Sequence, residues 1–147
     1  KNQIDVIKSF KGKLNNKKVN ILGTNYTVKV VCANKNGDSQ VSRVLAKQEA
    51  SALTQVFLKE IWIDLNQYAY GEDCESQVML DDNRAIDEDL THELYHAFFY
   101  ESGLDICTGT DGCENGWSRN EAMIDWNAKM FHKILKARRT LGIDDEF

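Results

Sequence analysis

The order of apolar and polar residues predicts a helix and a β-hairpin in the first third of the chain. Near the N-terminus, apolar residues recur at the spacing of an amphipathic helix, at Ile4, Ile7, Phe10 and Leu14. Residues 19–22 and 26–31 are rich in β-branched and aromatic residues, and Gly23-Thr24-Asn25 between them is typical of a turn. These two runs therefore predict a β-hairpin.

The middle of the chain predicts one more helix and one more strand. We interpret Arg43–Leu53 as a short helix. In Phe57–Leu65, apolar residues alternate with others, Ile61, Ile63 and Leu65 against Glu60, Trp62 and Asp64. Because successive side chains of a strand point to opposite faces, this alternation predicts a strand with one buried face.

Two predicted helices dominate the C-terminal half. Apolar residues recur at spacings of three and four from about Arg84, and Gly103 is a typical helix stop. A loop follows up to Arg119, and a long helix is predicted from Asn120, with an apolar stripe formed by Met123, Trp126, Met130, Ile134 and Leu141. This pattern in 147 residues indicates one α+β domain over residues 1–147.

Composition and charge exclude some functions. The formal net charge of −5 is unlike a surface that neutralises a phosphate backbone or anionic lipid, so we expect neither nucleic acid nor a membrane as partner. No apolar run approaches the roughly 20 residues that span a bilayer, and Lys1–Lys18 lacks the apolar block of a secretory signal. We therefore expect a soluble, cytoplasmic protein. Its oligomeric state is not predicted by the sequence.

The four cysteines do not form a recognisable metal or disulfide pattern. They are Cys32, Cys74, Cys107 and Cys113, and no Cys-x-x-Cys pair occurs. A domain large enough to bury its own core rarely depends on disulfides, so free thiols are expected. A loop bridge from Cys107 to Cys113 is the alternative.

The segment Thr91-His92-Glu93-Leu94-Tyr95-His96 carries the strongest chemical signal. Two residues four apart on a helix differ by about 40° in direction and roughly 6 Å in height, so His92 and His96 can reach one ion. Glu93, beside them, can act as a base toward a water molecule at an open zinc position. With three histidines in the whole chain, chance is a poor explanation of this spacing.

Catalytic zinc usually has three protein ligands, so a third is needed. The extended His-Glu-x-x-His-x-x-Gly-x-x-His pattern is absent, because Phe99 and Ser102 occupy its last two positions. Glu121 is the better candidate, since it opens the next predicted helix after a loop long enough to reverse the chain.

The segment Asn120-Glu121-Ala122-Met123-Ile124-Asp125 resembles the Asn-Glu-x-x-x-Asp segment of the gluzincin, or thermolysin-like, metallopeptidases. The run Thr91–Leu104, with a predicted hairpin and an Ile-x-Ile-Asp strand upstream, also resembles compact zincin-like peptidases encoded by phages and other mobile elements. The motif resemblance covers roughly the second half of the chain, and the first half is similar only in layout.

This resemblance implies a zincin-like fold, in which a small, mainly antiparallel sheet packs on the active-site helix and a long C-terminal helix. It implies that Glu121 is the third zinc ligand and that Asp125 orients His92. It also implies a zinc endopeptidase that acts on a peptide or protein substrate, with Glu93 as general base and then proton donor.

Other interpretations of these residues remain open. Ser118-Arg119-Asn120-Glu121 also matches a capping box, in which Glu121 only caps a helix. Asp125 can be a solvated helix residue. His132, about 16 Å along the helix from Glu121, and Asp111, in the glycine-rich loop, are rival ligands.

Substrate binding is expected to involve one strand of the sheet and one side chain that stabilises the oxyanion. We expect the strand within Phe57–Leu65 to pair with an extended substrate. Candidates for stabilising the oxyanion are Tyr68, Tyr70, Tyr95, Tyr100 and Arg119.

Two alternatives to a peptidase remain open. One is a non-catalytic metal-binding protein, such as a phage regulator or partner-binding protein that keeps a zincin fold, and the other is a metal-dependent hydrolase of other bonds. Glu93 favours catalysis, because a closed structural site has no use for its carboxylate.

Overall fold

A mixed four-stranded β-sheet lies at the centre of the computed structural model, which describes residues 12–32, 39–70, 78–79, 84–104 and 116–141. Its strands are β1 (Lys18–Ile21), β2 (Thr24–Val31), β3 (Ala52–Gln55) and β4 (Glu60–Asp64), in the spatial order β1-β2-β4-β3. The β2–β4 pairing is parallel, whereas β1–β2 and β3–β4 are antiparallel. The prediction of an α+β chain with a mainly antiparallel sheet is confirmed.

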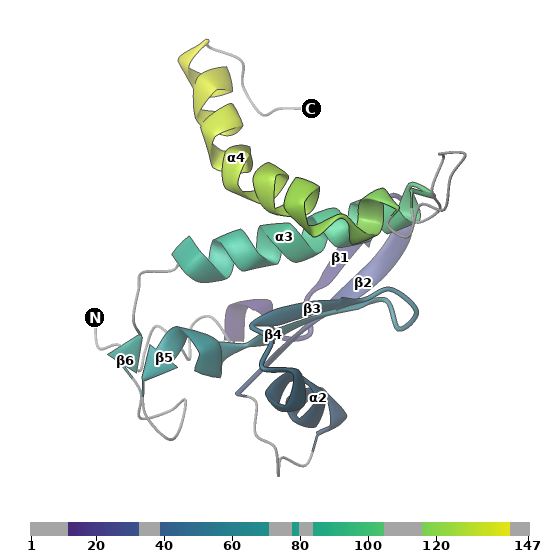
Figure 1. Ribbon diagram of the computed structural model, residues 1–147, viewed down its shortest axis with the longest axis vertical. Coiled ribbons are helices and arrows are strands. Elements are labelled where there is room, and N and C mark those ends of the chain that lie inside the picture. Colours follow the sequence, from purple (N-terminus) through teal and green to yellow (C-terminus); the bar gives the residue numbers. More distant parts are fainter. Residues whose placement is uncertain (1–11, 33–38, 71–77, 80–83, 105–115, 142–147) are drawn as a thin grey trace.

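Helices cover both faces of this sheet (Figure 1). Helix α2 (Gln40–Gln48) packs on one face, and α3 (Arg84–Glu101) crosses the other. Helix α4 (Glu121–Thr140) follows the short 3-10 helix η2 (Trp117–Arg119) and packs on the side of α3 that faces away from the sheet. A 3-10 helix, η1 (Leu65–Tyr68), leads from β4 to a separate two-stranded sheet of β5 (Ala69–Tyr70) and β6 (Val78–Met79).

The predicted hairpin is confirmed, with a tighter turn than the sequence indicated. Strand β2 begins at Thr24, which pairs with Ile21, so only Leu22 and Gly23 form the turn. Both have positive φ angles, 50° and 94°, as in the two-residue turns whose twist matches that of a hairpin. Gly23 reaches this conformation without the steric cost of a Cβ atom.

The helix predicted at Arg43–Leu53 is displaced. Helix α2 begins earlier, because the Ser39 side chain caps it by accepting a hydrogen bond of 3.1 Å from the Ser42 backbone N–H. It ends at Gln48, since Glu49 adopts a left-handed conformation with a φ of 52°. Leu53 therefore lies in strand β3 and not in the helix.

The prediction that one face of the strand within Phe57–Leu65 is exposed is wrong. Strand β4 lies between β2 and β3, and α2 contacts it from the second face. Trp62 and Asp64 are accordingly 3% and 1% exposed. An internal strand has no unpaired backbone groups to offer, so β4 cannot pair with a substrate, and β3 forms that edge of the sheet.

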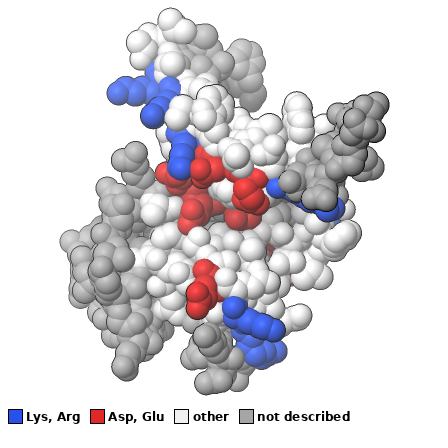
Figure 2. Space-filling model, viewed as in Figure 1, with Lys and Arg blue, Asp and Glu red and all other residues white. Residues whose placement is uncertain are grey.

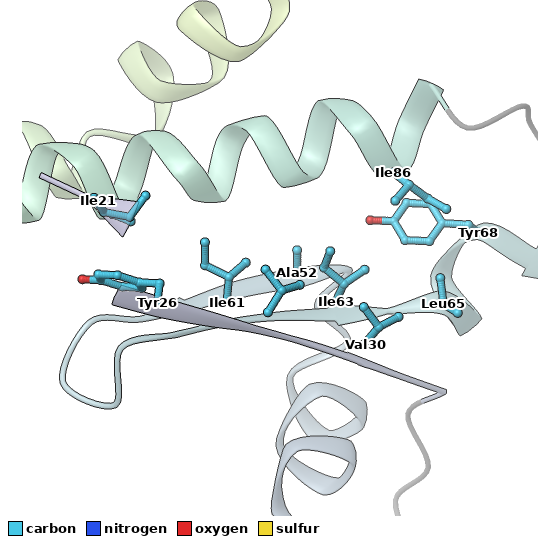
Figure 3. Packing of buried hydrophobic residues seen from close by; sticks show 11 residues of the cluster. Ile21, Tyr26, Val30, Ala52, Ile61, Ile63, Leu65, Tyr68 and Ile86 are labelled. Carbon is cyan, nitrogen blue, oxygen red and sulfur yellow. The ribbon is translucent and has the colours of Figure 1, made fainter. Parts of the chain in front are cut away.

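The main core lies between the sheet and α3 (Figure 3). Side chains from the hairpin, from β4 and from η1 point toward the helix, which adds Ile86 and Ala97 to the cluster. Both are at most 1% exposed. At the far end of α3, Gly103 has a φ of 75°, and its N–H bonds the Tyr100 carbonyl while that of Leu104 bonds the Phe99 carbonyl. The predicted helix stop is thus a Schellman motif.

Among the described residues of α4, the buried ones lie in its first turns. Ile124 and Ala128 are at most 1% exposed, whereas three residues of the predicted apolar stripe are mainly solvent-exposed: Trp126 at 57%, Ile134 at 52% and Leu141 at 75%. The stripe prediction is wrong for these three. Trp126 lies two residues from both Ile124 and Ala128 and so on the opposite side of the helix, whereas Ile134 and Leu141 belong to the part of the chain that extends beyond α3 (Figure 1). Among the described residues, no helix has the length and apolar content needed to cross a membrane.

The expectation of free thiols is wrong for Cys32, which is disulfide-bonded. Cys74, Cys107 and Cys113 lie outside the described residues, and the Cys107–Cys113 alternative with them. The predicted N-terminal helix lies mostly outside them too, although residues 12–14 are helical.

One partly buried carboxylate ties the C-terminal end of α3 to the sheet. Glu101 Oε1 accepts hydrogen bonds from the Tyr26 hydroxyl at 2.7 Å and from Lys59 Nζ at 2.5 Å, and Thr24 donates to Oε2 at 3.2 Å. The Glu101 side chain is 14% exposed. Its hydrogen bonds from Lys59 and Tyr26 hold the pKa of the Glu101 carboxyl below its usual range. The contact therefore favours the ionised group in the folded protein.

We expect Glu101→Gln to lower the free energy of unfolding by about 1–3 kcal/mol at pH 7, because it weakens charge-assisted hydrogen bonds. The lowered pKa means that this contribution is complete above the unfolded value of about 4.3 and is lost as pH falls through the folded value. Urea denaturation at pH 7 and pH 3 measures it, and the difference between wild type and variant should shrink at pH 3. Glu49→Gln, at an exposed position, is the control, and an equal loss there would contradict the assignment.

Candidate metal centre

Two histidines on the face of α3 turned from the sheet converge on one point. His92 and His96 lie one helical turn apart, and their Nε2 atoms are 3.1 Å from each other. Their side chains are 19% and 16% exposed, so both are shielded without being sealed off. The core residues Ile86 and Ala97 take the opposite side of the helix. The imidazoles therefore lie apart from the apolar face of α3.

The first residue of α4 completes this group. Glu121 Oε2 lies 3.1 Å from His92 Nε2, and Oε1 lies 3.2 Å from His96 Nε2. The helix cap is provided by a different residue, Asn120, whose Oδ1 accepts a hydrogen bond of 3.1 Å from the Met123 N–H. The capping-box interpretation of Glu121 is therefore not supported, because Ser118 lies in η2 and not at the N-cap.

The donor set fits a small divalent cation. The ligand atoms of His92, His96 and Glu121 all lie within 4.8 Å of one another. Ligand atoms bound tetrahedrally to zinc at about 2.0–2.2 Å are themselves roughly 3.3 Å apart, close to the separations of 3.1 and 3.2 Å found here. Two imidazoles and one carboxylate also match the ligand types of catalytic zinc sites, which leave a fourth position open.

The two imidazole rings differ in the groups that lie behind them. His96 Nδ1 lies 2.6 Å from the Ser118 carbonyl oxygen and can donate to it, which leaves Nε2 as the acceptor or ligand atom. His92 Nδ1 lies 4.0 Å from Asp125 Oδ1, beyond direct hydrogen-bond length. Asp125 therefore lies near His92 without a direct hydrogen bond to it, and it pairs with Lys129 at 2.8 Å. The contact between the Ser118 carbonyl and His96 was not predicted, because every residue has a backbone carbonyl and the sequence does not mark which one will contact a histidine.

Glu93 lies buried beside the two histidines. It is 7% exposed, and the Thr54 hydroxyl of strand β3 donates to its backbone carbonyl at 2.9 Å and to its Oε2 at 2.5 Å. Burial raises the pKa of the Glu93 carboxyl above its usual range, while Thr54 and both histidines act in the opposite direction. Thr54 was missed from sequence, because nothing near it marks a position opposite Glu93.

The cluster opens into a cleft of about 750 Å³ between β3, α3 and the start of α4. Residues 49–54 and Phe57 line one wall, and the other walls hold the candidate ligands, Asp89, Tyr100 and Arg119. Five acidic residues line it, Glu49, Asp89, Glu93, Glu121 and Asp125. In Figure 2, acidic side chains gather in the middle of the face of the molecule that is in view, and Lys and Arg lie toward the margins of that face.

The structure separates one of the two rival residues, His132, from this site. His132 Nε2 pairs with Asp87 Oδ2 at 2.5 Å on the surface, and its side chain is 55% exposed. Asp111 lies outside the described residues. His132 is therefore a surface histidine that is paired with Asp87 and lies outside the cluster.

Of the five oxyanion candidates, two line the cleft, Tyr100 and Arg119. Tyr68 is buried and donates to Asp89, and Tyr95 packs against Phe99 with ring centroids 5.8 Å apart. The side chain of Tyr70 lies outside the described part of the structure.

Comparison of the chain with models of protein families, with curated proteins and with solved structures gave no match.

Metal titration tests the centre. We expect one equivalent of zinc to bind and to raise the melting temperature by about 5 °C or more in excess metal. His92→Ala, His96→Ala and Glu121→Ala should each lower zinc affinity by at least about a hundredfold, and Asp125→Asn by about tenfold, since it changes only an outer partner. Calorimetric titration measures these affinities.

His132→Ala is the matched control, because it removes a histidine that lies outside the cluster. Its zinc affinity should equal that of the wild type. A loss of binding in His132→Ala, or unchanged binding in His96→Ala, would rule out this ligand set.

Proposed function

We propose that this protein is a zinc-dependent peptidase with a zincin-like fold, related in its site to the gluzincins. One observation carries the proposal: a buried glutamate lies beside three converging candidate ligand groups, at the wall of a cleft that the edge strand β3 borders. A structural metal site is closed by its ligands and does not require this carboxylate.

His92, His96 and Glu121 are the residues that would hold the ion. A zinc ion bound there would supply polarisation of a substrate carbonyl and a lowered pKa for an attacking water molecule. Glu93 accepts a proton from the attacking water and delivers it to the leaving amine. The C–N bond of the peptide is replaced by a C–O bond to the water oxygen, and the nitrogen gains the proton. Thr54 holds one oxygen of Glu93, which leaves the other for the transfer.

The substrate-pairing strand is β3, in place of the strand expected from sequence. It forms the edge of the sheet, and Ala52, Leu53 and Thr54 line the cleft. An extended peptide can add to the outer edge of β3 through backbone hydrogen bonds. The peptide carbonyl is then held next to Tyr100 and Arg119, the two described candidates for stabilising negative charge on its oxygen.

The disulfide at Cys32 bears on where this activity operates. Disulfides persist mainly in oxidising compartments and are rare in a reducing cytosol. We therefore favour an oxidising compartment over the cytoplasm that the sequence led us to expect.

The first test is the Glu93→Gln variant. It keeps the shape of the side chain but cannot accept a proton, so we expect zinc affinity within about threefold of wild type and hydrolysis reduced by at least about a hundredfold. A quenched-fluorescence peptide library, with products identified by mass spectrometry, measures the activity. Equal inactivity of the zinc-loaded wild type and the variant would favour the non-catalytic metal-binding alternative.

Thr54→Val tests the positioning of the base. Valine has nearly the same volume but removes the hydroxyl that donates to Glu93. We expect kcat to fall by about tenfold with little change in KM, because the base loses its orientation while the cleft keeps its shape. Thr27→Val, on strand β2 and outside the cleft, is the control. A pure KM effect at Thr54 would assign it to substrate binding instead.

A further inference from the structure

The cleft has two distinct ends. Its long axis can be followed because β3 and α3 run alongside each other in the same direction. Thr54 of β3 contacts Glu93 of α3, and farther along, the Phe57 and Tyr100 rings meet with centroids 6.2 Å apart. In the other direction, Tyr68 bonds both Ser51, just before β3, and Asp89 of α3. Three successive contacts thus define the axis of the cleft.

The histidine pair lies near the middle of this axis. Asp89 precedes His92 by three residues, or about 4.5 Å along the helix, and Tyr100 follows His96 by four residues, or about 6 Å. A residue of an extended peptide spans about 3.3 Å. If a peptide bond of the substrate is held at the histidines, the substrate side chains one or two positions away on either side therefore reach the two ends of the cleft.

One end of the cleft is acidic. Asp89 and Glu49 line it, and neither belongs to the candidate ligand set or contacts it as Asp125 does. Asp89 uses Oδ2 to accept from Tyr68. Arg119, the cationic residue among those lining the cleft, belongs to η2 beside Glu121 and not to this end. A cationic side chain of a substrate therefore complements the charge of this end, and an acidic side chain of a substrate is repelled by it.

The other end is apolar. Phe57 lines the cleft and is 88% exposed, next to Val56 and Tyr100. Lys59 is not available to a ligand, because its Nζ bonds Glu101 and lies 4.9 Å from the Tyr100 ring centroid. An exposed aromatic residue at the rim of a cleft offers apolar area that a large apolar side chain of a substrate can bury.

The direction of the substrate follows from strand pairing. β3 runs from the acidic end toward the apolar end. Antiparallel pairing is slightly more stable per residue than parallel pairing, so a peptide added to β3 runs the opposite way. Its N-terminal part then lies at Phe57 and Tyr100, and its C-terminal part at Asp89 and Glu49.

We propose that the preferred substrate is an extended peptide with a large apolar residue within two positions on the N-terminal side of the cleaved bond and with Lys or Arg within two positions on the C-terminal side. Phe57 and Asp89, with Glu49, are the residues that determine this preference. The inference rests on the proposed peptidase function and names the substrate class of the same site.

Two peptides of identical composition test the inference. In one, a Leu-Phe pair precedes a Lys-Arg pair, and in the other the two pairs are exchanged. The zinc-loaded wild type should cleave the first with at least about tenfold higher kcat/KM. Asp89→Asn combined with Glu49→Gln should reduce this ratio about tenfold, and Phe57→Ser should reduce cleavage of the first peptide but not of one with Ala-Ala in place of Leu-Phe.

Glu88→Gln is the matched control, since it removes a carboxylate next to Asp89 that does not line the cleft, and its ratio should stay that of the wild type. Cleavage of both orders at equal rates would overturn the preference while leaving the peptidase function intact. If no peptide is cleaved, binding of both labelled peptides to Glu93→Gln, measured by fluorescence anisotropy, decides. At least tenfold tighter binding of the first order supports the inference, and equal binding overturns it.

Discussion

The packing of α3 on the sheet fixes the rotation of that helix about its axis, and the site depends on this rotation. Ile86 and Ala97 are held against the core formed by the hairpin and β4, and burial of such side chains stabilises a protein by roughly 1–3 kcal/mol each. Because the helical repeat is 3.6 residues, fixing these two positions also fixes the direction of His92 and His96. If α3 were rotated about its axis by one residue, or about 100°, so that His92 and His96 faced the core, the imidazoles would be buried and could not converge with Glu121.

A second constraint acts at the start of α4. The η2 turn brings the Ser118 carbonyl to His96 and, three residues later, the Glu121 carboxylate to both rings. One short segment therefore both orients an imidazole and contributes the third candidate ligand. Asn120 caps α4 between them, so the helix begins at the residue whose side chain faces the histidines. This coupling explains why a cap and a ligand, which looked like competing roles for Glu121, are divided between neighbouring residues.

The sequence predicted the parts of the fold and site that depend on local order. The hairpin, α3 with its stop at Gly103, and the convergence of His92 and His96 follow from spacing along one element, and Glu121 was singled out because its segment resembles one in gluzincins and because it opens the next helix. Features set by contacts between distant segments were missed. Trp62 and Asp64 looked exposed because the sequence does not reveal that α2 covers their face, and Thr54 meets Glu93 only through the sheet order that makes β3 an edge. The Cys32 disulfide and the Ser118 carbonyl contact likewise leave no local pattern.

The buried contacts of helix α4 lie at its beginning, at Ile124 and Ala128, and a surface ion pair joins His132 to Asp87 of α3. These contacts place Glu121, while the later turns beyond His132 carry Ile134 into solvent and lead to the exposed Leu141. Residues in those later turns are not needed to maintain the spacing of the ligand atoms. Selection can therefore change the protruding part of α4 without disturbing the chemistry at its base, so that the two ends of one helix can diverge at different rates.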